Sequence, residues 1–234
     1  MWRMVNKQAL LQRWHALCAE LESDHVTMLA VSKYAPDEAV QCLIDAGQMD
    51  FGESRAQNLR DRALQFPSVR WHMIGPLQKN KAKYIARHAA MWHSVEDIET
   101  ARAVAGHVSD RRLPVLVQVN VADIGHQHGV SPDAVASLLS ELEKLPALQV
   151  IGLMCMAPRQ GDAHACFAAL RSLRDGLLNR SLDAYASQQP SRSGAPGSES
   201  SGLSLCMGMS GDYRIAIAEG ADMVRLGSGL FDAG

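Results

Sequence analysis

The stretch "LSLCMGMSGDYRIAIAEGADMVRLGSG" (203–229) joins two short apolar runs through one short helical pattern. The runs are "LSLCMGMS" (203–210) and "DMVRLGS" (222–228), and their apolar residues sit largely at consecutive positions. Consecutive apolar residues are typical of strands that are buried on both faces of a parallel sheet. The stretch therefore predicts a strand, a helix at 212–219 and a second strand parallel to the first.

The same alternation extends back through the chain. The earlier apolar runs lie at 26–33, 49–54, 69–76, 91–95, 114–121 and 148–156. The earlier helical patterns lie at 36–46, 55–65, 77–89, 96–107, 132–144 and 162–178, and an amphipathic helix at 3–23 precedes them all. Eight strands with intervening helices predict a single-domain (β/α)8 TIM barrel over 1–234 with an extra N-terminal helix. An open doubly wound sheet is the alternative.

One stretch interrupts the alternation. "SQQPSRSGAPGSESSG" (187–202) is rich in Ser, Gly, Pro and Gln and has no apolar face. Such a composition cannot bury enough apolar surface to order itself, so we expect a flexible surface loop inserted before the seventh strand. It does not divide the chain into domains, because too little sequence follows it to form a second core.

Composition narrows the functional classes. The formal net charge is −2, which gives no general attraction to nucleic acid or to an anionic membrane. No window reaches the roughly 18 apolar residues of a membrane span, and the N-terminus lacks a signal-peptide pattern. The five cysteines are scattered without a CxxC pair, which favours reduced, buried thiols. We expect a cytoplasmic protein that binds neither nucleic acid nor a membrane.

A metal site is weakly indicated. "GHQHG" (125–129) spaces His126 and His128 as some metal sites do, but no third ligand accompanies them. We expect a solvated turn there and no bound metal. His72 and His93 lie in predicted strands beside tryptophans, and we expect hydrogen-bonded core or rim histidines.

The carboxyl ends of the strands carry the chemistry of a TIM barrel. At the last two ends, "MGMSGD" and "RLGSG" supply the hydroxyls of Ser210 and Ser228. Glycines around them let backbone amides approach a ligand, and a helix that begins near Gly211 would direct its positive end inward. Phosphate often binds after strands seven and eight of this fold, although ordinary turn and cap residues would give the same pattern.

Lys33 ends the first apolar run, "VTMLAVSK" (26–33). A lysine held among apolar walls is desolvated, which favours a neutral amine that can attack an aldehyde. An aldehyde and a phosphate occur together in pyridoxal 5'-phosphate (PLP). The alternative is that Lys33 extends into solvent and pairs with Glu53. The residues alone leave both interpretations open.

Five segments together resemble the pyridoxal-phosphate homeostasis proteins, which are fold-type III barrels related to the N-terminal domain of alanine racemase. The segments are "AVSKYAPDEAVQCLIDAGQMDFGESRAQNL", "WHMIGPLQKNKAKYI", "VLVQVNV", "GLMCMAP" and "LCMGMSGDYRIAIAEGADMVRLGSGLF". The resemblance implies a Schiff base between Lys33 and PLP, phosphate contacts, and Arg225 near the pyridine nitrogen. The cofactor-binding residues that it implies are Lys33, Ser54, Met209, Ser210, Arg225, Gly227 and Ser228.

The chain departs from the family at two places. Gly52-Glu53-Ser54 stands where the family usually has Gly-Glu-Asn, so we expect Ser54 to reach the cofactor only through water or not at all. The insertion at 187–202 is longer than we expect for the family.

Asn80 and Lys81 match the family's Q-x-N-K pattern, and we expect a second, weaker phosphate site there.

Arg225 affects whether bound PLP could support catalysis. A guanidinium would donate to an unprotonated pyridine nitrogen and disfavour the protonated ring, which weakens the ring as an electron sink. The alternative is a structural ion pair with Asp222 or Glu53. Fold-type III racemases also place an arginine here but carry a second, mostly β domain. This chain ends at Gly234, shortly after the eighth strand, and we expect no such domain.

Three hypotheses follow. The first is a monomeric PLP carrier that acts in PLP homeostasis, holds the cofactor as a Schiff base without substrate turnover and exchanges it with PLP-dependent apo-enzymes. The second is a PLP-dependent enzyme that resembles an amino-acid racemase. The third is a barrel-shaped interaction module that binds no cofactor.

Overall fold

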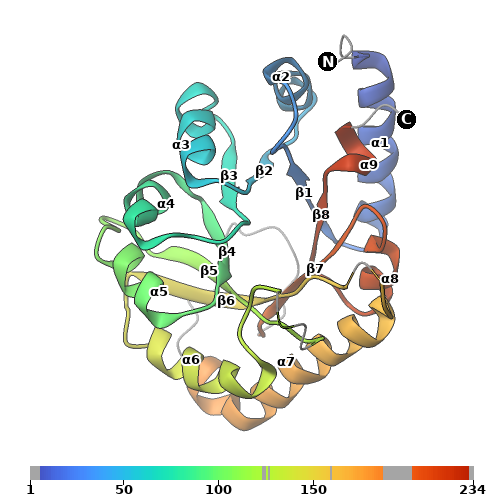
Figure 1. The fold of residues 1–234 in the computed structure, drawn as a ribbon. Helices are drawn as coiled ribbons and strands as arrows, with labels where there is room; N and C mark the ends of the chain where they lie inside the picture. The colour runs from blue at the N-terminus through green and yellow to red at the C-terminus, as the bar shows by residue number, and fades with distance from the viewer. Residues whose placement is uncertain (1–5, 123–124, 126, 159, 187–201, 232–234) are drawn as a thin grey trace.

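The computed structural model describes residues 6–122, 125, 127–158, 160–186 and 202–231. Within these residues eight parallel strands close into a barrel in chain order, and helices surround it (Figure 1). The predicted (β/α)8 TIM barrel is confirmed, and the open sheet is excluded because β1 pairs with β8 through the register Leu29↔Arg225.

The strands are β1 (Thr27–Val31), β2 (Asp50–Glu53), β3 (Arg70–Met73), β4 (Met91–Val95), β5 (Leu113–Gln118), β6 (Leu148–Met154), β7 (Ser204–Met209) and β8 (Met223–Leu226). The helices are α1 (Lys7–Ser23), α2 (Asp37–Asp45), α3 (Ala56–Gln65), α4 (Ala82–His88), α5 (Ile98–Ala105), α6 (Val135–Leu142), α7 (Ala163–Ala186), α8 (Tyr213–Ala218) and α9 (Ser228–Phe231). Short 3₁₀ turns, η1 (Lys79–Lys81) and η2 (Pro132–Ala134), lead into α4 and α6.

Most elements are shorter than their predicted ranges, and three differences bear on the site or on the fold. β1 ends at Val31, two residues before Lys33, and α7 continues to Ala186 rather than ending at 178. The four-residue α9 was not predicted, because "SGLF" is too short to show a helical period. The loop predicted at 187–202 lies outside the described residues except for Gly202.

Packing explains why two glycines stand where they do. β6 and β7 approach so closely that a Cβ on Gly152 would lie 2.0 Å from the carbonyl oxygen of Ser204. Gly208 in β7 has φ +92°, and a Cβ there would lie 2.6 Å from the Cβ of Ala216 on α8. Both positions therefore require glycine, the first for space and the second also for backbone conformation.

α1 lies against the outside of the barrel, beside α9 (Figure 1). The Trp14 indole donates a 2.9 Å hydrogen bond to the side chain of Gln48, which precedes β2. Arg13 donates to the carbonyl of Leu230 on α9, and Tyr213 on α8 donates to Glu20. These contacts attach the extra helix to the segment before β2 and to helices α8 and α9.

Most of the apolar core fills the space between the strands and the helices. A second, smaller cluster of Leu116, Met154 and Cys206 lies apart from it, with partly buried Met91, Met156 and others packed against it. No helix within the described ranges has the length and apolarity that crossing a bilayer requires.

Candidate functional site

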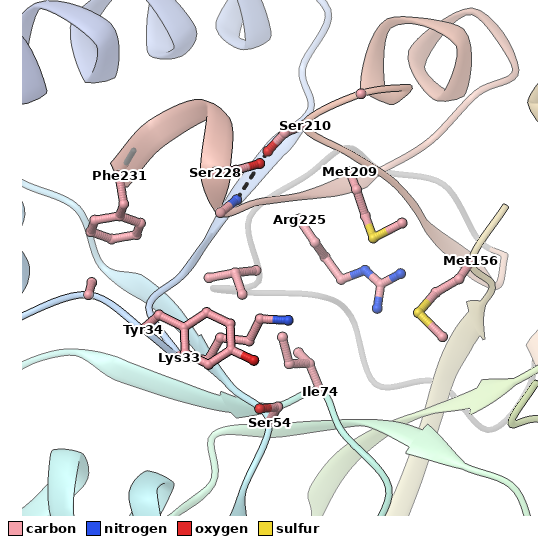
Figure 2. A pocket seen from close by; sticks show the side chains of 14 residues that line it. Lys33, Tyr34, Ser54, Ile74, Met156, Met209, Ser210, Arg225, Ser228 and Phe231 are labelled. Atoms are coloured by element: carbon pink, nitrogen blue, oxygen red, sulfur yellow. Dashed lines mark hydrogen bonds between the residues drawn. The ribbon is translucent and has the colours of Figure 1, made fainter. Parts of the chain in front are cut away.

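A cavity of about 520 Å³ opens at the carboxyl ends of the strands (Figure 2). This volume lies within the usual range for small-molecule sites. All seven predicted cofactor-binding residues line it. Lys33 and Ser54 follow β1 and β2, Met209 and Ser210 come from the end of β7, and Arg225, Gly227 and Ser228 come from β8 and the turn after it. The fold thus brings together residues up to 195 positions apart.

Lys33 lies at the mouth of the cavity, and its side chain is exposed. Of the two interpretations left open for Lys33, the structure contradicts the one in which its side chain is buried among apolar walls. The backbone leaves the sheet after Val31, and Lys33 and Tyr34 occupy a turn that the Ala35 N–H closes by donating to the Ser32 carbonyl. The Lys33 Nζ lies 5.1 Å from the centre of the Tyr34 ring, a cation–π contact at the cavity rim (Figure 2).

Glu53, the alternative partner proposed for Lys33, is bound by other residues. The buried Glu53 carboxylate accepts a 2.8 Å hydrogen bond from the Ser32 hydroxyl and lies 3.8 Å from Arg62 Nε. Burial raises the pKa of Glu53, and the Ser32 hydrogen bond and the charges of Arg62 and Lys33 oppose that rise. Among the described residues the ion pair of Glu53 is therefore with Arg62, and Lys33 is left at the cavity mouth.

Two loops meet at one end of the cavity. The Ser210 hydroxyl accepts a 3.3 Å hydrogen bond from the backbone N–H of Gly227 (Figure 2). It accepts a second, at 2.9 Å, from the backbone N–H of Gly229. A Cβ on Gly229 would lie 3.2 Å from that hydroxyl, so a side chain there would crowd the pair. Backbone N–H groups that converge on one point, with exposed Ser228 beside them, are suited to an anion.

The helix predicted near Gly211 begins two residues later. α8 starts at Tyr213, and Asp212 accepts a 2.6 Å hydrogen bond from the Met209 N–H before it. The turn after β7 is therefore held by a carboxylate, while the amides of the turn after β8 face Ser210.

Arg225 lies deeper in the cavity, between Met209 and Met156, with 4% of its surface exposed (Figure 2). Its Nη2 donates a 3.0 Å hydrogen bond to the Cys155 carbonyl, but its Nε is buried with no hydrogen-bond partner in the described part of the chain. The alternative carboxylates have other contacts, since Asp222 accepts from the Leu205 N–H and Glu53 pairs with Arg62. A buried guanidinium with an unsatisfied donor indicates a site for a ligand that accepts a hydrogen bond.

Apolar side chains form the remaining walls, and sequence reasoning did not assign them to the site. Val31, Ile74 and Met156 line the cavity, and Phe231 on α9 closes one side (Figure 2). Val31 ends β1 and Ile74 directly follows β3, which was the signal available for these two residues, and Phe231 ends the short α9. Ser54 lines the cavity, and whether it contacts a ligand directly remains a prediction.

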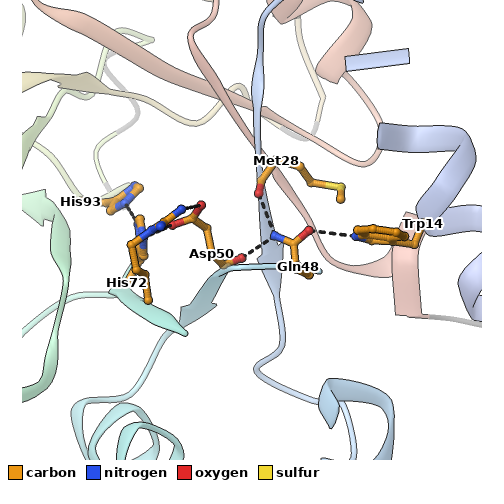
Figure 3. A network of polar contacts seen from close by, with 7 residues as sticks. Trp14, Met28, Gln48, Asp50, His72 and His93 are labelled. Carbon is orange, nitrogen blue, oxygen red and sulfur yellow. Dashed lines mark hydrogen bonds and ion pairs between the residues drawn. The ribbon is translucent and has the colours of Figure 1, made fainter. Parts of the chain in front are cut away.

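A buried polar network lies below the cavity (Figure 3). His72 contacts Asp50 through Nε2 at 3.0 Å and His93 through Nδ1 at 2.9 Å, and His93 in turn lies 3.4 Å from the Cys206 sulfur. Arg70 donates twice to Asp50. The prediction of hydrogen-bonded core histidines is confirmed for both.

The contacts in this network determine the protonation of Asp50 and His93. Burial by itself raises the pKa of Asp50, but the hydrogen bonds from His72 and Arg70 outweigh it and lower that pKa to about 2. Burial, with the nearby His72 and Arg225, holds the pKa of His93 well below its usual value. His93 is thus a neutral imidazole near Arg225.

The remaining candidates lie away from the cavity. Within the described ranges no group of three or more His, Cys, Asp or Glu could hold a metal ion. His128 contacts Glu96 at 3.1 Å, and His126 is outside the described residues. Asn80 and Lys81 are not among the residues that line the cavity, and the second phosphate site stays a prediction.

Comparison with known proteins identifies the family. The family model "Alanine racemase, N-terminal domain" matches residues 5–233. The chain is 36% identical over 213 residues to the pyridoxal phosphate homeostasis protein of Deinococcus radiodurans, with 88% of each chain covered. The chain belongs to the pyridoxal phosphate homeostasis protein family. The protein of that name from Pseudomonas aeruginosa is 34% identical over 238 residues, which cover 98% of this chain and 94% of the relative.

Solved structures agree with this assignment. PipY of Synechococcus elongatus, solved with PLP bound, superposes with a TM-score of 0.79 at 30% identity and covers 95% of this chain and all of its own. Alanine racemase of Clostridium difficile, at 14% identity and a TM-score of 0.72, shares the fold, and this chain spans 58% of it. The resemblance to pyridoxal phosphate homeostasis proteins is confirmed.

Proposed function

We propose that this member of the pyridoxal phosphate homeostasis protein family binds PLP in the cavity of about 520 Å³ and acts in PLP homeostasis as a carrier. PLP supplies an aldehyde that the Lys33 amine can hold reversibly as a Schiff base with loss of water. The observation that carries the proposal is the buried Nε of Arg225, which has no hydrogen-bond partner among the described residues and shares one cavity with a lysine amine and converging backbone amides.

The residues present fit this cofactor. Arg225 would donate to the ring nitrogen, and the amides of Gly227 and Gly229, with the Ser210 and Ser228 hydroxyls, would hold the phosphate. Ile74, Met209 and Met156 supply apolar surface for a flat ring. PipY, with PLP bound, is similar over nearly the whole chain, which supports the same ligand here.

Arg225 also limits the carbanion chemistry that a bound PLP ring could support. A guanidinium cannot accept a proton from the ring nitrogen, so it disfavours the protonated ring that carbanion chemistry needs. His93 stays neutral below it and offers no compensating charge. The exposure of Lys33 at the rim keeps its amine accessible to free PLP and to competing amines, as capture and release require.

We also propose that the protein is a cytoplasmic monomer that exchanges PLP with PLP-dependent apo-enzymes. The five cysteines are all free, which supports a reducing compartment. Mixing the PLP-loaded protein with an apo-enzyme and following the recovered enzyme activity would test the transfer.

A titration tests the binding proposal. The chain freed of cofactor should gain visible Schiff-base absorbance with added PLP until one equivalent is bound, and Lys33→Ala should gain none. Lys83→Ala is the matched control, because Lys83 lies over Tyr84 at 5.3 Å much as Lys33 lies over Tyr34 but is outside the cavity. A wild-type chain that stays colourless contradicts the proposal and favours the interaction module. Exchange of the α-proton of alanine in deuterated water, lost in Lys33→Ala, would instead favour the racemase-like alternative.

A further inference from the structure

The turn that carries Lys33 is held by side chains on neighbouring elements. After β1 ends at Val31, the backbone turns at residues 32–35 and brings Lys33 to the mouth of the cavity. The buried Ser32 hydroxyl donates a 2.8 Å hydrogen bond to the Glu53 carboxylate at the end of β2. The start of the turn is therefore fastened to the neighbouring strand.

Arg62 on α3 holds the other end of the turn. Its Nη2 donates a 2.6 Å hydrogen bond to the Ala35 carbonyl, and its Nη1 donates to the carboxylate of Asp37, the first residue of α2. The guanidinium also lies over the Phe66 ring, 6.0 Å from its centre, and 15% of the Arg62 side chain is exposed. A planar guanidinium bound to two acceptors is a rigid link between α3 and the turn.

The same guanidinium also supports the start of the turn. Its Nε lies 3.8 Å from Glu53 Oε1, the oxygen that accepts from Ser32. Glu53 is 1% exposed, and its Oε2 has no hydrogen-bond partner in the described part of the chain. A buried carboxylate needs an opposite charge, so Arg62 stabilises the group that holds Ser32. One side chain of α3 therefore acts on both ends of the turn.

The position of the Lys33 amine depends on the backbone of this turn. Lys33 and Tyr34 are both exposed at the rim, and Tyr34 has 73% of its surface exposed (Figure 2). Their cation–π contact joins two neighbouring exposed side chains and fixes neither to the barrel. The amine meets an aldehyde in the cavity only where the turn presents it, and a misplacement of about 1 Å can slow a reaction about a hundredfold.

We propose that Arg62 is a positioning residue for the reaction of Lys33 with the PLP aldehyde. Arg62 is not among the described residues that line the cavity, so it acts through the turn and not on the ligand. The covalent step is the one already proposed: the Lys33 nitrogen bonds to the aldehyde carbon, and the aldehyde oxygen leaves as water with the two amine hydrogens. The inference rests on the proposed binding of PLP, but the hold of Arg62 on the turn can be measured without the cofactor.

Proteolysis of the cofactor-free chain tests the hold on the turn. An endoproteinase specific for lysine should cleave after Lys33 roughly tenfold faster in Arg62→Met, because the two hydrogen bonds that hold the end of the turn are lost. Arg60→Met is the matched control on the same helix, since Arg60 pairs with the exposed Asp61. Cleavage after Lys144, beyond the end of α6, should stay unchanged in both variants. Cleavage of Arg62→Met after Lys33 at the wild-type rate would overturn the proposal.

Asp37→Ala serves where Arg62→Met fails to fold. The Asp37 side chain is 55% exposed, and its loss removes one contact of Arg62 while the contacts with Ala35 and Glu53 remain. Cleavage after Lys33 should then rise by a smaller factor, roughly threefold. A rate equal to that of the wild type in this variant would also overturn the proposal.

The rate of Schiff-base formation gives the second readout. With PLP in excess, the visible absorbance should develop roughly tenfold more slowly in Arg62→Met than in the wild type or in Arg60→Met. Pyridoxine 5'-phosphate, which has an alcohol in place of the aldehyde, should bind all three chains alike, because Arg62 acts through the turn. Arg62→Lys should recover part of the rate, since its ammonium reaches one of the two acceptors.

Two results of this second measurement would overturn the positioning role. One is an unchanged rate in Arg62→Met, and the other is a loss of pyridoxine 5'-phosphate binding as large as the loss of rate. A wild type that gains no absorbance with PLP counts against the proposed function alone, because the proteolysis needs no cofactor.

Discussion

The hydroxyl of Ser210, on the turn after β7, accepts a 2.9 Å hydrogen bond from the backbone N–H of Gly229, on the turn after β8. The Gly227 N–H converges on the same oxygen at 3.3 Å. An oxygen atom is therefore already held at the point where two neighbouring loops of the barrel meet. This is the position where a phosphate oxygen of PLP would find its donors.

Ser210→Ala tests the phosphate end of the cavity. It removes one ligand contact and the group that orders the two amides, so PLP affinity should fall roughly tenfold. Pyridoxal, which has the aldehyde and ring but no phosphate, should bind wild type and variant alike in the same titration. Ser140→Ala on the exposed face of α6 is the control. An equal loss for both ligands would argue against a phosphate contact.

Arg225→Met separates stability from binding. Methionine fills the space without a buried charge, and replacing buried ionic groups by apolar ones is often neutral or stabilising by about 1–4 kcal/mol. The free energy of unfolding of the cofactor-free chain in urea should therefore not fall, while PLP binding weakens. Arg111→Met is the contrasting variant: it removes donors to the carbonyls of Ala86 and Ala89 and should lower stability without affecting PLP. Tight PLP binding by Arg225→Met would contradict the assigned role.

Asp50 should make the free energy of unfolding depend on pH in the acid range. Its pKa falls from 3.8 to about 2 on folding, so the unfolded chain binds the proton more readily. The stabilisation, about 2.5 kcal/mol, is complete above pH 3.8 and is lost as the pH falls toward 2. Urea unfolding at a series of pH values should show this slope, and Asp50→Asn should flatten it. Asp61→Asn, an exposed substitution, should retain it.

Gly208 and Gly47 test the packing of α8 on β7. Both have positive φ, +92° and +105°, but a Cβ on Gly47 meets nothing within 4 Å, while one on Gly208 meets Ala216. Gly47→Ala should cost about 1–2 kcal/mol of unfolding free energy from backbone strain alone. Gly208→Ala should cost a further 1–3 kcal/mol or so for the overlap. Equal losses in urea would mean that α8 moves freely away from β7.

The sequence predicted the barrel because each strand is a run of apolar residues and most helices space their apolar residues three or four positions apart. It also predicted where the site lies, since the carboxyl ends of parallel strands gather at one mouth. Both inferences depend on local patterns. Lys33, Ser210, Gly227 and Ser228 were candidates from these patterns, and the family resemblance supplied Ser54, Met209 and Arg225.

Other features depend on contacts between distant residues, which one sequence does not display. Asp50 meets Arg70 because β2 and β3 pair in that register, so the charge below the cavity was not predicted. The exposure of Lys33 follows from where β1 leaves the sheet, a two-residue difference that an apolar run does not resolve. Ile74 and Phe231 line the cavity because the closed barrel brings the ends of β3 and α9 to the same opening.

The most direct test of the central claim is reductive trapping. Borohydride added to the PLP-loaded protein converts a Schiff base into a stable amine, and mass analysis of the digest then locates the modified lysine. We expect one adduct, on the peptide that contains Lys33, and none on the peptide that contains Lys81. An adduct confined to another lysine, or no adduct in a protein saturated with PLP, would contradict the account.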